Sequence, residues 1–259
     1  MTRLCLKSFA TSKGFFLGLT ICVVCFFSIF ANANTELLFT GKAYDLDSEH
    51  LLYVERHNIK LTAAGEYLSS QVNYFDPDGK LIATKYLDFS DSQTMPKLRF
   101  VDGRINAKIE VETFDKKKQH GVRILQERGS ERQVSEVKTE DKQTSIIDAG
   151  FNLYAMSNWQ RLIEGGTLEM DFLALTRSEY IGFKLEPANL ENKAETGHMV
   201  LSLSPQNFFI SLLMEPIYLT YDINSKRLIR FEGLTNLEMV EQGKGLGDNF
   251  VARIEYSYL

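Results

Sequence analysis

The segment Phe250–Tyr258 (FVARIEYSY) carries the pattern that decides the fold. Its apolar and polar side chains alternate with a period of two. Because successive residues of a β-strand point to opposite faces of the sheet, such a segment buries one face and exposes the other. The same alternation is clear in 105–111 and 167–172, and it recurs with more noise in 36–46, 49–57, 66–75, 80–89, 119–128, 179–186, 197–203, 215–223 and 226–234.

Turn sequences separate these segments at intervals of roughly 10–15 residues. In Asp76-Pro77-Asp78-Gly79, proline fixes φ at the second turn position and glycine accepts the left-handed geometry that closes a hairpin. Such short spacing favours antiparallel neighbours over crossover helices. We therefore predict a mainly β protein, a curved antiparallel meander or half-open barrel of about ten or more strands.

One segment, 148–164, breaks the alternation with helical spacing. Phe151, Tyr154 and Trp159 belong to its apolar stripe, and Gly165 follows as a C-terminal stop. We predict an amphipathic helix there, inserted into a single antiparallel β domain that spans 34–259, and we expect one or two helices to pack on the concave face of the sheet.

Two further segments leave alternatives open. The run 205–214 is short and apolar, with Ser204 as a candidate cap, and fits either a buried helix or a strand. The stretch 112–145 is the most polar part of the chain, and it fits long exposed strands or a mobile excursion.

The first 33 residues have the composition of a signal peptide. A basic segment, 1–13, precedes the uncharged apolar run Gly14–Phe30, and Ala31-Asn32-Ala33 supplies the small-x-small pattern that predicts cleavage after Ala33. The run is 17 residues long, at the lower end of the roughly 17–25 that span a bilayer, so an uncleaved anchor is the alternative. Both interpretations place the folded domain beyond the inner membrane, because the positive end of the leader stays inside. We predict the periplasm as its location, with the external medium as the alternative, and membrane contact only through the leader.

Removal of the leader changes the charge and the available chemistry. Residues 34–259 hold 26 Lys and Arg against 34 Asp and Glu, a net charge of −8, and all three cysteines (Cys5, Cys22 and Cys25) lie in the leader. An acidic chain disfavours nucleic acid as a partner. Without a thiol, the domain has no cysteine nucleophile, no thiolate metal site and no disulfide.

No compact catalytic or metal-binding motif stands out. The four histidines, His50, His57, His120 and His198, do not form the HxH or HExxH spacing of metal sites, and no Gly-x-Ser-x-Gly elbow occurs. The sequence therefore assigns no catalytic residue, no metal ligand and no cofactor. A hydrolase built from dispersed Asp, Glu, Ser and His residues stays open as a third functional class.

Aromatic residues in or beside the two non-alternating segments suggest a ligand site. They either fill the concave face or leave part of an apolar concavity open for a lipid or acyl chain. The alternative function is a structural or interaction module of the cell envelope that holds a protein partner through an open sheet edge. The candidate ligand-binding residues are Phe151, Tyr154, Trp159, Phe172 and Phe208.

Four segments carry a family resemblance. They are GKAYDLDSEHLLYVERH (41–57), VNYFDPDGKLIATKYLDFS (72–90), AGFNLYAMSNWQRLIEGGTLEMDFLALTRSEYIGFKLE (149–186) and YDINSKRLIRFEGLTNL (221–237). These segments resemble those of uncharacterised exported proteobacterial proteins, a family without an assigned activity. The predicted architecture is also similar to the half-open barrels of periplasmic lipoprotein-localisation carriers. That similarity implies a fold and no site residues.

Overall fold

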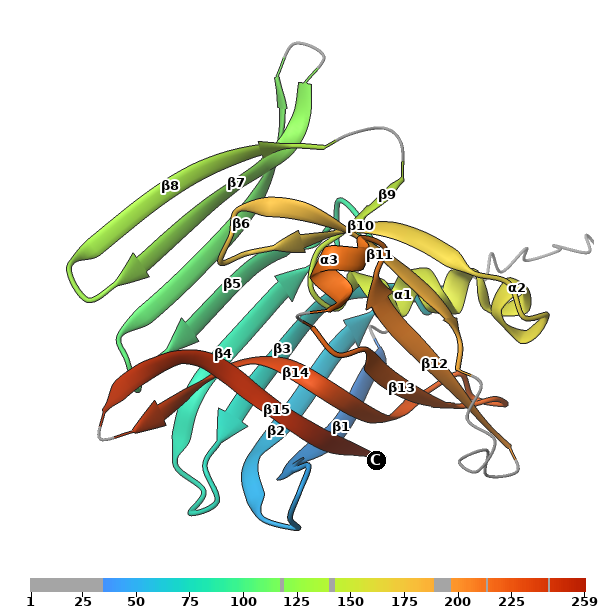
Figure 1. The fold of residues 1–259 in the computed structure, drawn as a ribbon, viewed down its shortest axis with the longest axis horizontal. Coiled ribbons are helices and arrows are strands. Elements are labelled where there is room, and N and C mark those ends of the chain that lie inside the picture. The colour runs from blue at the N-terminus through green and yellow to red at the C-terminus, as the bar shows by residue number, and fades with distance from the viewer. Residues whose placement is uncertain (1–34, 117–118, 140–142, 189–196, 213, 242) are drawn as a thin grey trace, which may run out of the picture. The chain divides into compact units, whose positions relative to one another are not determined.

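The segments with period-two alternation form strands of one curved sheet (Figure 1). The computed structural model describes residues 35–116, 119–139, 143–188, 197–212, 214–241 and 243–259. The predicted leader, with Ala31 and Ala33, lies outside the described residues. The strands are β1 (Thr35–Asp45), β2 (Leu51–Leu61), β3 (Tyr67–Phe75), β4 (Leu81–Asp88), β5 (Lys97–Asp102), β6 (Ala107–Lys116), β7 (Gln119–Arg128), β8 (Glu131–Lys138), β9 (Thr144–Ile146), β10 (Leu168–Ala174), β11 (Glu179–Pro187), β12 (His198–Pro205), β13 (Ile217–Asp222), β14 (Leu228–Glu241) and β15 (Lys244–Tyr258).

The strand order is that of a meander whose first and last strands are neighbours. The order is β8-β7-β6-β5-β4-β3-β2-β1-β15-β14-β13-β12-β11-β10-β9, so the first and last strands pair in the middle and β8 and β9 form the two edges. The chain passes from one edge to the other between Lys138 and Thr144. Since a residue spans at most about 3.6 Å, those edges come within about 20 Å of each other, which requires the sheet to curl. The predicted curved, mainly β, half-open architecture is confirmed.

One pair of strands departs from the antiparallel prediction. β9 runs parallel to β10, with Met170 opposite Thr144 and Phe172 opposite Ile146, whereas the other adjacent pairs of the described sheet are antiparallel. β9 can run parallel to β10 because the chain reaches this edge from the far edge of the sheet and not through a hairpin. β5 is a strand that the sequence did not predict. In the polar stretch 112–145 the described residues form strands and not an excursion: β8 is mostly exposed, whereas β7 buries Val122 and Ile124 in the core.

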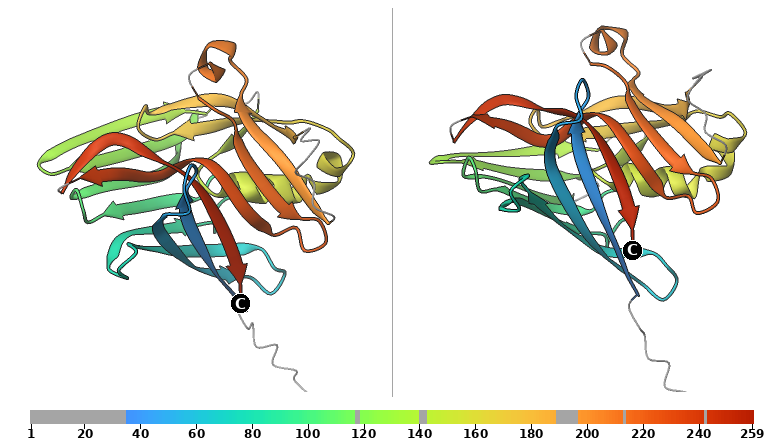
Figure 2. Two further views of the ribbon diagram at one scale, coloured as in Figure 1. Left: turned by 60° about the horizontal axis from the view of Figure 1, so that its bottom comes forward. Right: turned by 90° about the horizontal axis from the view of Figure 1, so that it is seen from below.

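The helix predicted over 148–164 forms as two shorter helices. α1 spans Gly150–Ser157 and α2 spans Trp159–Ile163, with a break at Asn158. The Asn158 side chain donates a hydrogen bond of 2.9 Å to the carbonyl of Tyr154. An asparagine amide that bonds to the backbone in this way competes with regular helix geometry. Both helices lie on the inner side of the curved sheet (Figure 2).

The third helix corrects the prediction that 205–214 is buried. α3 spans Phe208–Ser211, and its cap is Asn207, not Ser204, because the Asn207 Oδ1 accepts hydrogen bonds from the amides of Phe209 and Ile210. Phe208 and Phe209 are 69% and 75% exposed. None of the helices in the described ranges is long and apolar enough to cross a membrane.

The core consists of three apolar clusters on the inner face. The first joins α1 and α2 to β9–β13, the second joins β1–β4 to β14 and β15, and the third joins β4–β7 to β10 and the segment before α1. α1 contributes Phe151 and Ala155 to the first cluster and Leu153 to the third. The helix therefore fills the space between two parts of the curled sheet.

Candidate functional site

The structure brings four of the five predicted aromatic residues together. Trp159 is 5% exposed and contacts Tyr221 edge-on, with ring centroids 5.5 Å apart. Phe151, Tyr154 and Phe172 are half-buried against the same cluster. Phe208 is absent from this group, because it lies on the exposed helix α3. The aromatic side chains of α1 and α2 thus fill much of the concave face beneath β9–β13.

A buried hydroxyl group of this apolar region, that of Tyr221, has a hydrogen-bond partner. The Tyr221 hydroxyl donates a hydrogen bond of 3.0 Å to Asn152 Oδ1 on α1. Burial is the main cause that raises the pKa of Tyr221 far above its ordinary value. This side of the inner face is therefore apolar and uncharged at neutral pH.

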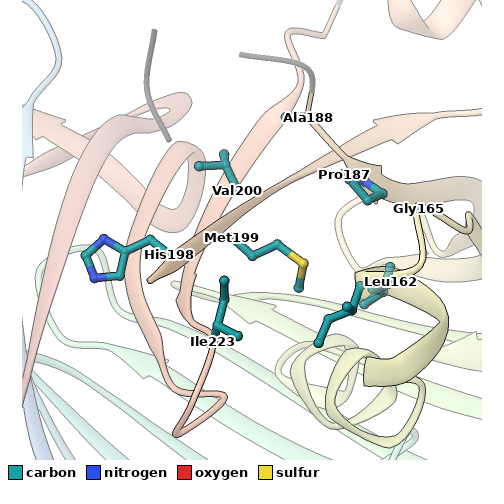
Figure 3. Close-up of a pocket in the computed structure, with 9 residues that line it drawn as sticks. Leu162, Gly165, Pro187, Ala188, His198, Met199, Val200 and Ile223 are labelled. Carbon is teal, nitrogen blue, oxygen red and sulfur yellow. The ribbon is translucent and has the colours of Figure 1, made fainter. Parts of the chain in front are cut away.

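A cleft of about 340 Å³ opens beside this cluster, between α2 and the ends of β11, β12 and β13 (Figure 3). Leu162, Met199 and Ile223 point toward one another across it (Figure 3). Its volume lies at the small end of the range of about 300–1,000 Å³ that is usual for ligand pockets. The other lining residues are Ile163, Gly165, Pro187, Ala188, His198 and Val200.

His198 is the titratable residue in the lining of this cleft. Its ring points away from Leu162 (Figure 3), and its cross-strand partner is Asp222 on β13. The pKa of Asp222 lies below its usual value, mainly because Ser225 donates hydrogen bonds to its carboxylate. The charge of His198 also contributes to this lowering. The cleft therefore presents an apolar floor with one polar group at its side.

A second, polar cluster lies on the inner face of β2. Tyr53, Glu55 and His57 alternate with outward residues, so they share one face of the strand. Glu55 is only 5% exposed, and its Oε2 lies 2.8 Å from His57 Nε2. The His57 ring also stacks on Phe39 of β1, with centroids 4.1 Å apart. A buried carboxylate next to an imidazole is the combination that binds or moves protons in many sites.

Two tyrosines from neighbouring strands complete this polar cluster. Tyr74 is the cross-strand partner of Glu55 on β3, and Tyr256 is the partner of Gly41, the residue opposite Glu55 on β1. A Cβ atom at Gly41 would lie 2.7 Å from the Tyr256 ring, so glycine gives that ring its place. Burial first, and the charge of Glu55 second, raise the pKa values of Tyr53, Tyr74 and Tyr256 well above the ordinary value.

The hydroxyl of Tyr53 is an unsatisfied polar atom within this cluster. The residue is 0% exposed, and its hydroxyl makes no hydrogen bond to the described part of the chain. Thr235 lies near enough to lower the pKa of Tyr53 somewhat, yet without hydrogen-bond geometry. Most buried polar atoms of folded proteins have hydrogen-bond partners, so this hydroxyl retains the capacity for a hydrogen bond that the described residues do not fill.

A buried ion pair borders the polar cluster. Lys85 Nζ on β4 lies 2.8 and 3.0 Å from the two oxygens of Asp148, just before α1. The Asn236 amide of β14 donates to the same carboxylate at 3.3 Å, and the Ala149 amide donates at 2.8 Å. This pair ties the N-terminal half of the sheet to the start of the helix.

The sequence contained one signal for the polar cluster. Tyr53-x-Glu55-x-His57 alternates inside the predicted strand 49–57 and so places three hydrogen-bonding side chains on one face. A comparison of the histidines with one another does not detect this pattern, because the pattern joins a histidine to a tyrosine and a carboxylate. Within the described residues, no group of three or more His, Cys, Asp or Glu side chains is placed to hold a metal ion.

Comparisons with known proteins find a weak structural similarity. No family model matches the chain, and no curated protein matches it. Over 86% of its length, this chain is similar to the crystal structure of a beta-barrel-like protein of domain of unknown function DUF1849 from Brucella abortus. The similarity covers 95% of that protein's chain. The identity is 6% and the TM-score is 0.30, so this likeness carries no argument about function.

Proposed function

We propose that this chain is an exported periplasmic protein that binds an apolar ligand, such as one acyl chain of a lipid, in the cleft between α2 and β11–β13. The observation that carries the proposal is the apolar lining, in which Leu162, Met199 and Ile223 converge on one space. Removing a hydrocarbon chain from water into such a lining is favourable by about 25 cal/mol per Å² of apolar surface.

The position of the cleft also supports binding. One wall is α2, whose residues Trp159 and Leu162 are anchored in the buried apolar cluster. The opposite wall comes from Met199 on β12 and from Ile223, which directly follows β13, the strand paired with β12. Leu162 and Met199 lie on regular elements, which hold side chains in position better than loops do, so less conformational entropy is lost when a ligand binds.

A thermal-shift titration tests this function. The probes are decanoic acid and 1-decanol, which share a chain and differ in the head group. A ligand that binds only the folded state raises the melting temperature in a concentration-dependent way. Ile223→Trp fills the cleft from its rim and should abolish the shift. Leu234→Trp, an equally exposed position on β14, is the matched control and should retain it.

The result that contradicts the proposal is equally specific. Equal shifts in the wild type and Ile223→Trp would place the ligand elsewhere, and flat melting curves for both probes would remove the binding function itself.

Export rests on the leader sequence, 1–33. Expression in a Gram-negative host, followed by fractionation and N-terminal sequencing, should recover a chain that begins at Asn34 in the periplasmic fraction. Recovery of an intact Met1 from the cytosol would contradict both export and the proposed cleavage after Ala33.

A second candidate function is an envelope interaction module that acts through the edge strand β8. This strand ends the sheet, and its residues are mostly exposed, including Val134 at 47%. An unpaired edge can accept a strand from a partner by main-chain hydrogen bonds. A photo-crosslinker at Val134 should capture one defined envelope protein, and Glu136→Pro, which removes a main-chain donor on the side of β8 that faces away from β7, should abolish the capture. Recovery of the monomer alone would exclude this function.

A further inference from the structure

Among the described residues buried beneath β1–β5, one carboxylate has no permanent cation beside it. Lys85 is paired with Asp148, and Asp102 is paired with Arg104. Glu55 lies in the same cross-strand row as Tyr74, Ala83 and Asp102, on the same face of the sheet. Among the described residues, the ion-pair partner of Glu55 is His57, which is charged only when protonated.

This arrangement favours a cation. Isolated buried charges are costly, so a carboxylate at 5% exposure is stabilised by any positive group that reaches it. With a neutral His57, the two ion pairs cancel and Glu55 leaves the region with a net negative charge. The rings of Phe39 and Tyr256 contact His57, and Tyr74 is the cross-strand neighbour of Glu55. The faces of tyrosine rings attract cations as well.

We propose that the polar cluster of Tyr53, Glu55, His57, Tyr74 and Tyr256 binds a small organic cation with a primary ammonium group. The ammonium group has three donors and no acceptor. Glu55 accepts one charge-assisted hydrogen bond, the unsatisfied hydroxyl oxygen of Tyr53 accepts another, and the tyrosine rings flank the attached carbon. The ammonium group competes with the His57 imidazole for the Glu55 carboxylate.

This site is distinct from the apolar cleft in place and in chemistry. The polar cluster is built on β1, β2, β3 and β15, whereas the cleft is built on α2, β11, β12 and the end of β13. Failure of acyl-chain binding would therefore leave the ammonium site untouched, and the converse also holds.

Isothermal titration of the purified protein with n-butylammonium chloride tests the proposal, with sodium butyrate and 1-butanol as probes of the same chain length. We expect heat of binding from butylammonium alone. Glu55→Gln keeps the shape and removes the charge, so binding should weaken by about tenfold or more, the usual effect of losing a charged hydrogen-bond partner. Glu36→Gln, an exposed carboxylate on β1, is the matched control and should bind like the wild type.

A variant with the opposite effect separates binding from a loss of folding. His57→Phe preserves a ring against Phe39 and removes the competing imidazole, so it should bind butylammonium more tightly than the wild type. Tyr53→Phe should bind more weakly, because it removes one acceptor without changing the ring. Equal affinities of Glu55→Gln and the wild type, equal binding of butyrate, or no binding of butylammonium by the folded wild type would each overturn the proposal.

Discussion

Two parts of one sheet have inner faces of opposite chemistry. Beneath β9–β13 the inner face is aliphatic and aromatic, and the helices α1 and α2 cover it. Beneath β1–β5 the inner face carries Glu55, Lys85 and Asp102 among tyrosines. Both parts come from the same period-two pattern. Alternation therefore determines which side chains point inward. The element that packs against the inner face determines whether a charge there is tolerated.

The partner elements explain the contrast. α1 and α2 bring Trp159 and Leu162 against the first region, where an unpaired charge would have no counter-ion. The second region faces β14 and the turn before α1, which supply Thr235, Asn236 and Asp148. Four substitutions, taken in order of decreasing loss of stability, test this contrast.

The largest loss should follow removal of the ring that fills the apolar region. Trp159→Ala leaves a cavity beside Tyr221 and should lower the free energy of unfolding by about 4 kcal/mol. Phe208→Ala, on the exposed helix α3, should change it by no more than about 0.5 kcal/mol. Urea denaturation of both variants measures the difference, and similar losses would show that Trp159 is not a core residue.

A smaller loss is expected in the charged region. Lys85→Met leaves Asp148 as an uncompensated buried carboxylate and should cost about 3 kcal/mol. The double variant Lys85→Met/Asp148→Asn should recover most of that loss, because asparagine keeps an acceptor for the Ala149 amide and tolerates the φ of 45° at this position. If the double variant is no more stable than the single one, the pair does not act through charge.

Gly41→Ala tests the packing of the polar cluster. The added methyl group would come 2.7 Å from the Tyr256 ring, and the displacement should cost about 1–2 kcal/mol. Gly41→Ala combined with Tyr256→Leu removes that ring and should show little further loss from the alanine. Additive losses in a double-mutant cycle would mean that Gly41 and Tyr256 do not share this space.

The smallest effect is expected at a surface contact between β7 and β14, two strands that are far apart in the strand order. Arg128 on β7 donates two hydrogen bonds to Glu238 on β14, from Nη1 to Oε2 at 3.1 Å and from Nη2 to Oε1 at 2.8 Å. Half of the Arg128 side chain is exposed. Arg128→Ala should therefore cost about 0.5–1 kcal/mol, and less at high salt.

This contact also has a predictable pH dependence. Burial raises the pKa of Glu238, but hydrogen bonds from Arg128 and the Gly247 amide outweigh it and leave the pKa below the usual value. A carboxylate with a lowered folded-state pKa stabilises the protein above its unfolded-state pKa and loses that effect as the pH falls through the folded-state pKa. The difference between Arg128→Ala and the wild type should thus disappear in acid. A difference that persists at low pH would contradict an ionic contact.

The sequence was sufficient for the local elements with strong periodicity. The alternation in 167–172 and 250–258 predicted strands that form as parts of β10 and β15. β5 was missed because its alternation, Lys97-Leu98-Arg99-Phe100, covers only four residues before the turn sequence that begins at Val101. The parallel pairing of β9 with β10 depends on where the chain crosses between sheet edges, which no local pattern records.

The sites were less predictable, because burial depends on distant partners. Phe208 belongs to an apolar run that resembles a core segment, yet Gln206 anchors the base of this segment to Gly182 and Phe183 and leaves α3 exposed. Glu55 resembles an ordinary surface carboxylate in the sequence. Its burial follows from the register of β1, β2 and β3, which brings Gly41 and Tyr74 opposite it.

The most direct test of the two chemically distinct inner faces is a crossed binding experiment. Decanol and butylammonium are each titrated into Ile223→Trp and Glu55→Gln. Decanol binding should be lost only in Ile223→Trp, and butylammonium binding only in Glu55→Gln. Loss of both ligands in either variant would contradict two separate sites on one curved sheet.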